Sequence, residues 1–141
     1  MTHERFEVRT EDVLHERLDG ETIIVNMRTG RYLSLKGPAS DIWYLIAQGV
    51  PRMSWLNELS HVWPRAKETD VESFVTKLVN QELIRRSETS LITNPIDWPA
   101  DMLRDEWVLE DPEEFDDLAD LILIDPVHDV DEEGWPKKKG S

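Results

Sequence analysis

The sequence contains no cysteine, and this absence excludes disulfide bonds, thiolate metal ligands and cysteine nucleophiles together. It also contains no run of roughly 18 to 20 consecutive apolar residues, the length that a helix needs to cross a bilayer. The opening stretch, MTHERFEVRTED, is charged and has no apolar core, so we expect no signal peptide. These absences predict a cytoplasmic protein without a membrane partner.

Recognisable catalytic and cofactor-binding motifs are missing as well. The four histidines have no metal-ligand spacing, and the chain has no H-E-x-x-H motif, nucleophile elbow or glycine-rich phosphate loop. His128 lies among Asp125, Asp129 and Asp131, a set that could ligate a divalent cation, but a solvated acidic segment is the preferred interpretation. The sequence therefore predicts that the protein is not an enzyme and holds no cofactor and no metal.

Negative charge is in excess, and it is unevenly placed. Residues 1–94 carry 14 acidic and 12 basic side chains, whereas residues 95–141 carry 16 acidic and 4 basic ones. This shift predicts a domain over residues 1–94, followed by an acidic tail that is partly disordered or docked. Nucleic-acid binding depends on clustered positive charge, so we expect no nucleic-acid partner.

The domain combines short strands with helices. Residues 13–18, 22–26 and 31–36 are strand-like and are separated by Asp-Gly and Thr-Gly turns, which predicts a three-stranded antiparallel meander. Three helices follow: one opens at Pro38, one covers about residues 54–63, and one runs from a capping box of Thr69 and Glu72 to about Ile84. A short strand-like segment spans residues 90–93. This order predicts an α+β fold that is winged-helix-like, with an acidic C-terminal extension.

Winged-helix domains that bind DNA place a helix in the major groove, so a transcriptional regulator is one alternative. Here the third helix mixes Lys77 and two amide side chains with three acidic residues. That balance repels phosphate about as much as it attracts it, which disfavours this alternative.

The third strand of the meander offers a different kind of site. An edge strand has unpaired N–H and C=O groups, to which an incoming peptide can add as a further strand. A neighbouring apolar groove would give such binding its specificity. Alternatively, the edge is covered by the protein's own tail or by a partner in a homodimer.

The tail combines acidic charge with aromatic residues. Pro95 and Pro99 predict an extended linker, and Trp98, Trp107 and Trp135 are spaced along the tail. Charge keeps such a segment in solution while aromatic side chains make the contacts. We therefore expect these tryptophans to bind, either to the protein's own domain or to a partner.

Four motifs occur in order between about residues 10 and 92. They are an LDGE turn, the hairpin N-x-x-T/S-G-x-Y-x-x-L from Asn26 to Leu35, the helix start G-x-A-x-x-I-W from Gly37, and the helix D-V-x-x-F-V-x-x-L from Asp70, followed by ELI. As an ordered set they resemble the PqqD-like family, whose members recognise the leader segments of ribosomally synthesised and post-translationally modified peptides (RiPPs).

The resemblance implies a peptide chaperone, or RiPP recognition element, that binds a precursor's leader as a strand added to the third strand. It would present the leader to a separate modifying enzyme, for which a radical S-adenosylmethionine protein is the implied class. The residues that would pair with the peptide are Arg31, Tyr32, Leu33, Ser34 and Leu35. The candidates that would line the groove on the third helix are Val71, Phe74, Val75, Leu78 and Val79.

The tail departs from the family pattern, and two interpretations of it stay open. In the first, it is a fused precursor-like segment in which residues 120–125 (DLILID) act as a leader strand in cis. In the second, which we prefer, it is an autoinhibitory or partner-docking segment. Beyond Asn94 the chain has no cysteine and only Ser141 as a hydroxyl residue, so azole and lanthionine chemistry have almost nothing to act on.

Overall fold

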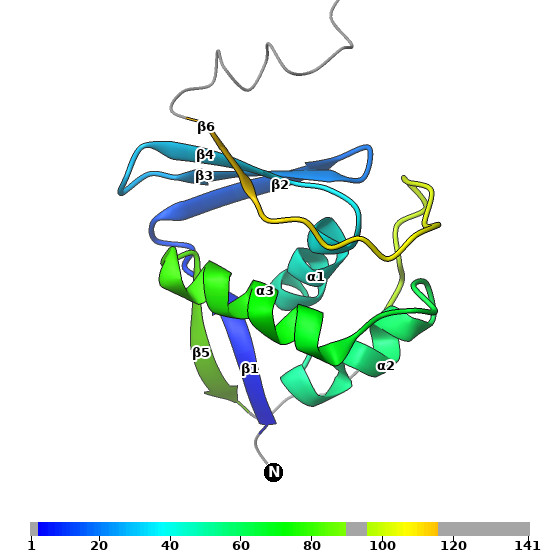
Figure 1. The fold of residues 1–141 in the computed structure, drawn as a ribbon. Helices are drawn as coiled ribbons and strands as arrows, with labels where there is room; N and C mark the ends of the chain where they lie inside the picture. Colours follow the sequence, from blue (N-terminus) through cyan, green and yellow to red (C-terminus); the bar gives the residue numbers. More distant parts are fainter. Residues whose placement is uncertain (1–2, 90–95, 116–141) are drawn as a thin grey trace, which may run out of the picture.

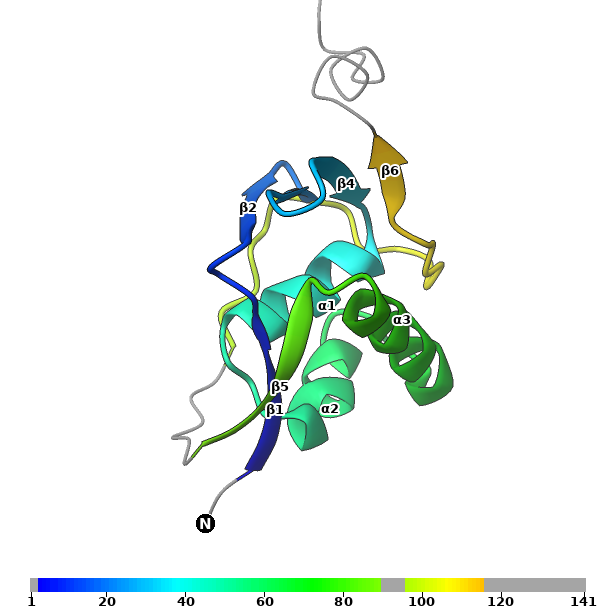
Figure 2. The same ribbon diagram turned by 90° about the vertical axis from the view of Figure 1, so that its left-hand side faces the viewer.

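The computed structural model describes residues 3–89 and 96–115, an α+β fold with antiparallel strands in two sheets and three α-helices (Figure 1). The strands are β1 (His3–Val8), β2 (Val13–Leu18), β3 (Glu21–Asn26), β4 (Arg31–Leu35), β5 (Ile84–Thr89) and β6 (Glu113–Phe115). The helices are α1 (Pro38–Ala47), α2 (Trp55–Ser60) and α3 (Glu68–Asn80), and a short 3₁₀ turn (Arg52–Ser54) precedes α2. The helices lie on one side of the larger sheet, next to the smaller sheet (Figures 1 and 2).

The larger sheet has the strand order β2-β3-β4-β6. Its first three strands form the predicted antiparallel meander, which is confirmed. Both connecting turns use positive φ angles: Asp19 and Gly20 have φ of 51° and 80°, and Gly30 has φ of 77°. The fourth strand, β6, comes from the acidic tail and is not part of the sequence prediction.

The smaller sheet pairs β1 with β5, and the sequence patterns predict neither strand. In β1, charged side chains alternate with the buried Phe6 and Val8, which is the period of a strand with one face on the core. The third helix ends at Asn80 rather than near Ile84, because Glu82 adopts a positive φ of 61° and the chain then enters β5. The segment expected at residues 90–93 lies outside the described residues.

The helix starts agree with the sequence only in part. Pro38 lies in the first turn of α1, as predicted, with Gly37 at the N-cap. The predicted capping box of α3 is wrong. Lys67 is the N-cap residue, and no side chain caps this helix, because Thr69 already lies inside the first turn. The second helix is also shorter than predicted.

The hydrophobic core lies between the helices and the inner face of the larger sheet. Ile24 and Leu33 sit opposite each other on this face and are 0% and 3% exposed. Trp43 of α1 and Leu78 of α3 are buried against the same cluster. Burial of such apolar surface is the main stabilising contribution in a domain of this size, and here it fixes β4 beside α3. Among the described residues, none of the helices combines the length and the apolar character of a membrane-spanning segment.

Candidate peptide-binding site

The edge of β4, where an added strand is expected, is occupied by the chain's own tail. β6 pairs antiparallel with β4, with Tyr32 opposite Phe115 and Ser34 opposite Glu113. Figure 2 shows β6 beside β4. Of the alternatives that the sequence leaves open for the edge, the structure therefore shows cover by the protein's own tail.

Residues 96–115, which we call the strap, reach this edge by running across the domain. In Figure 1 the strap is drawn in yellow to orange and ends in β6. The apolar side chains of the strap that pack against the core are Ile96, Trp98, Met102, Trp107 and Leu109. This part of the tail is therefore docked onto the domain. The boundary predicted at residue 94 falls in the gap between the described segments.

A buried ion network around Asp41 of α1 holds the middle of the strap. The Asp41 side chain is 0% exposed, and its carboxylate lies 2.9 Å from the guanidinium of Arg17 in β2. It also accepts hydrogen bonds from Arg104 Nε of the strap at 2.7 Å and from Trp63 Nε1 at 2.8 Å. A buried carboxylate is tolerated only when it is paired in this way. The network thus joins β2, α1 and the strap.

A second carboxylate, Asp101, ties the strap to the turn between β2 and β3. It accepts two hydrogen bonds from Arg17, each of 2.9 Å, and one of 3.0 Å from the backbone N–H of Gly20. The Arg17 guanidinium lowers the pKa of Asp101 to about 2. Gly20 also gives the strap room, because a Cβ atom at this position would lie 2.5 Å from Cβ of Met102.

We expect Asp101→Asn to lower the free energy of unfolding at neutral pH by roughly 2 kcal/mol, the equivalent of moving a carboxyl pKa from 3.8 to about 2. Because the folded-state pKa is the lower one, this stabilisation is complete above about pH 5 and is lost as the pH falls towards 2. Urea unfolding of both chains at several pH values measures the difference, which should shrink over this window. A difference independent of pH would show that Asp101 does not stabilise the fold as a carboxylate.

The prediction that tail tryptophans bind is confirmed for Trp98 and Trp107, and both bind to the protein's own domain. The rings of Trp98 and Tyr44 have centroids 5.7 Å apart. Trp107 packs edge-to-face on Trp63 at 6.1 Å, and its Nε1 donates a 2.9 Å hydrogen bond to Asp70 of α3. The third tail tryptophan lies outside the described residues.

Residues 108–115, which we call the arm, form the end of the strap and are held differently. The ion pairs of the arm with the domain are Asp111–Lys77, Glu113–Lys36 and Glu114–Arg31. Each side chain in these pairs is at least 38% exposed. Exposed ion pairs contribute at most about 1 kcal/mol each. The ion pairs of the arm are therefore weaker than the buried network that holds residues 96–107.

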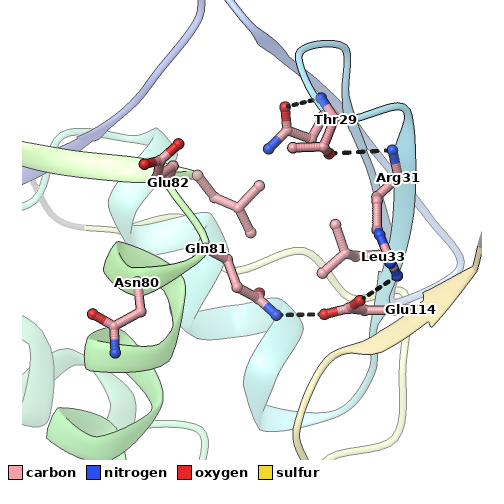
Figure 3. Close-up of a pocket in the computed structure, with 9 residues that line it drawn as sticks. Thr29, Arg31, Leu33, Asn80, Gln81, Glu82 and Glu114 are labelled. Carbon is pink, nitrogen blue, oxygen red and sulfur yellow. Dashed lines mark hydrogen bonds and ion pairs between the residues drawn. The ribbon is translucent and has the colours of Figure 1, made fainter.

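A cavity of about 270 Å³ opens beside Glu114, between the start of β4 and the end of α3 (Figure 3). The carboxylate of Glu114 accepts hydrogen bonds from Arg31 at 2.9 Å and from Gln81 at 2.6 Å. The other residues that line the cavity are Asn26, Thr29, Leu33, Asn80, Glu82 and Leu83. Both side chains that bind the Glu114 carboxylate, Arg31 and Gln81, are donors, and the other carboxylate in the lining, Glu82, is paired with Arg28. A residue of an added strand at the position of Glu114 would therefore meet hydrogen-bond donors, so the cavity suits a side chain that accepts hydrogen bonds.

The residues of β4 that the sequence assigns to peptide binding lie at the occupied edge. Tyr32, Leu33 and Ser34 pair with β6, and Arg31 binds the Glu114 carboxylate. Leu35 lies beyond the three pairs, with its side chain 1% exposed in the core. The backbone at this edge accepts a strand, as the prediction requires.

The apolar residues of α3 that the sequence assigns to the groove are placed mostly in the core. Val71, Phe74, Val75 and Leu78 are 4% exposed or less, in the cluster against which the strap packs. Val79 is 38% exposed and lines a separate depression with side chains of the smaller sheet and the 3₁₀ turn. A contact between this apolar set and a peptide stays a prediction.

The side chains of α3 and its C-cap that hydrogen-bond or ion-pair with the strap are polar and are not part of the predicted site. They are Asp70, Lys77 and Gln81. Their spacing of seven and four residues places them on one stripe of the helix. The pattern of apolar residues gives no signal for them, because their role depends on where the strap lies.

Within residues 3–89 and 96–115 there is no cluster of histidine, aspartate and glutamate side chains that could hold a metal ion. The candidate cation ligands around His128 and the candidate leader strand at residues 120–125 both lie outside the described residues.

Comparisons with known proteins do not decide the family of this chain. No protein-family model matches it, and neither the curated proteins nor the solved structures gave a match. The function therefore has to be argued from the geometry of the β4 edge.

Proposed function

We propose that the domain is a peptide-recognition module that binds the leader segment of a ribosomally synthesised peptide and presents it to a separate modifying enzyme. In this proposal the meander and three helices are the winged-helix-like unit of a PqqD-like domain, and a radical S-adenosylmethionine enzyme is the partner class that the resemblance suggests. The observation that carries the proposal is β6, because three residues of a flanking segment add to β4 in the ladder that an incoming peptide would use.

Affinity and specificity come from different parts of such a site, the backbone of β4 and the side chains around it. The backbone of β4 gives affinity through strand pairing that does not depend on sequence. Specificity comes from the side chains around it. These are Arg31 in β4, Lys36 directly after β4, Lys77 in α3 and Gln81 at the C-cap of α3. These groups act on whatever peptide occupies the edge.

The strap disfavours the alternative of a transcriptional regulator. It lies along α3, with Trp107 bound to Asp70 and Asp111 bound to Lys77. A helix whose cation is neutralised by an acidic segment has little attraction for DNA phosphates.

Synthetic peptides test the proposed function directly. The probes are fluorescein-labelled peptides of about 20 residues, one for the start of each short reading frame beside the gene, titrated with the full-length protein. We expect one of them to bind saturably and to shift the backbone amide NMR signals of residues 32–34 and of the last turn of α3. If no peptide binds, either to the wild-type chain or to a chain whose arm has been released, the proposed function is wrong.

One observation also supports a second candidate function, in which the tail is itself a precursor-like segment. The strand that occupies β4 belongs to the same chain, so the residues after Phe115 would follow a leader that is bound in cis. Co-expression with the modifying enzymes encoded nearby, followed by mass measurement of the C-terminal fragment, tests this candidate. A changed mass supports it, and an unchanged mass beside an enzyme that is active on another substrate contradicts it.

A further inference from the structure

We propose that the arm is a built-in competitor for the β4 edge, and that the ligand which displaces it is an acidic peptide strand with an aromatic residue opposite Tyr32. This inference rests on the proposed function, because it assigns the chemistry of the peptide that the edge takes. It also adds a form of regulation, since the competitor is part of the same chain.

The charges of the groove define the first requirement for the ligand. Four of the eight residues of the arm are acidic. Three of these four, Asp111, Glu113 and Glu114, meet the cations Lys77, Lys36 and Arg31. A second strand that adds in the same register meets the same cations, as well as the amide donor of Gln81 beside the cavity. Carboxylates at the positions of Asp111, Glu113 and Glu114 therefore suit this site, and complementary charge also speeds encounter.

The outer face of the larger sheet defines the second requirement. Residues directly opposite each other in antiparallel strands share a face, so Phe115 follows Tyr32, Val25 and Leu14 in one cross-strand row. Phe115 is 8% exposed, whereas Leu14 at the far edge of the sheet is 55% exposed. An aromatic residue at the Phe115 position extends this apolar row across β4 and shields it from water.

The arm has features that make it replaceable. It pairs with three of the five residues of β4, and Pro112 falls at the register position opposite Leu35, where proline has no N–H to donate. Its ion pairs are exposed. A peptide with the same charges and no proline at this position can extend the ladder, so it can bind the edge more tightly than the arm does.

The anchored part of the strap keeps the arm close to the edge after it has detached. Arg104 and Asp101 are fixed in the network of Arg17 and Asp41, and the arm follows after a few residues. A short tether of this kind gives an effective concentration in the millimolar range. The arm therefore sets a threshold, because a peptide in trans occupies β4 only if it outcompetes a ligand that is always present.

A full-length chain with Glu113→Lys and Glu114→Lys tests the competition, because the new lysines face Lys36 and Arg31 and should release the arm. The probe is a labelled, end-capped peptide of residues 107–115 that carries Pro112→Val. We expect the released chain to bind this probe about tenfold more tightly than the wild-type chain does, as measured by fluorescence anisotropy.

The matched control is a chain with Asp105→Lys and Glu110→Lys. It changes the net charge equally at two exposed strap positions that have no ion-pair partner among the described residues. The control should bind the probe as weakly as the wild-type chain does. Circular dichroism spectra of the three chains should coincide, which separates release of the arm from unfolding.

A second probe tests the ligand chemistry. It carries Glu113→Lys, Glu114→Lys and Phe115→Ala in the peptide, and should bind the released chain at least tenfold more weakly than the first probe. Equal affinity of the first probe for all three chains, or no binding to any of them, would overturn the competition. Equal affinity of the two probes would overturn the requirement for acidic and aromatic residues.

These results are separable from the proposed function. If the first probe binds the released chain but no peptide from the neighbouring reading frames does, the competition stands and the leader function falls. If a leader peptide binds the wild-type and released chains equally well, the leader function stands and the competition falls.

Discussion

Asp41→Asn is expected to lower the free energy of unfolding by about 3–5 kcal/mol, as observed when one partner of a buried ion pair is removed. In the folded protein Asp41 is 0% exposed and compensates both Arg17 and Arg104. After the substitution, Arg17 keeps Asp101, but Arg104 keeps no carboxylate partner and retains only neutral ones, the carbonyl of Pro99 at 2.7 Å and the ring of Trp98. A guanidinium that is only 12% exposed would then face a neutral amide, and this uncompensated charge accounts for most of the loss.

Urea unfolding, followed by tryptophan fluorescence, measures this effect. The control is Asp105→Asn, which removes an exposed carboxylate from the same strap and should change the free energy of unfolding by less than about 0.5 kcal/mol. A double variant with Asp41→Asn and Arg104→Met should be more stable than the sum of the single variants predicts, because the unpaired guanidinium is gone. Strict additivity would show that Asp41 and Arg104 do not form one network.

The parts of the fold that the sequence predicts correctly have local signals. The meander depends on turns at Asp19-Gly20 and Gly30, where positive φ restricts the choice of residue. The start of α1 depends on Pro38. Each signal lies within a few residues of the structure it produces, so no knowledge of the rest of the chain is needed.

The strands that the sequence analysis misses depend on distant partners. β1 pairs with β5, far along the chain, and its charged residues hide the alternation of Phe6 and Val8. β6 is the sequence Glu-Glu-Phe, which has no intrinsic preference for a strand. It forms a strand because its backbone pairs with the edge of β4 and because Arg31 forms an ion pair with Glu114. Tertiary context, rather than propensity, decides both cases.

The candidate site likewise contains residues with a local sequence signal and residues whose role depends on distant parts of the chain. The strand that accepts β6 could be found from the hairpin motif, because that motif defines β4 itself. The polar stripe on α3 could not, because its role depends on a strap that the pattern of apolar residues does not place. One signal was available in the tail: Arg104 is its only basic residue before Lys137. A lone cation in an acidic segment is a candidate for a specific buried pair, and the structure places it against Asp41.

Trp107 joins the anchored part of the strap to the arm, and Trp107→Ala is expected to lower the free energy of unfolding by about 3 kcal/mol. Truncation of a large aromatic side chain that packs against the core costs about this much, and here the ring contacts Trp63 at a centroid distance of 6.1 Å. Trp107→Phe keeps a ring on Trp63 but removes the donor to Asp70, so it should cost only about 1 kcal/mol. Circular dichroism in urea, rather than fluorescence, measures both variants, since each removes a fluorophore.

Trp107→Ala and Trp107→Phe also test whether the stability of the strap affects how far the arm occupies the β4 edge. Without the Trp107 ring, the arm is tethered from Arg104 instead, and a longer tether lowers the effective concentration of the arm at β4. Trp107→Ala should therefore bind the acidic probe peptide in trans more tightly than Trp107→Phe does. The opposite order would mean that Trp107 forms part of the peptide site itself, because loss of its side chain would then weaken binding rather than relieve competition.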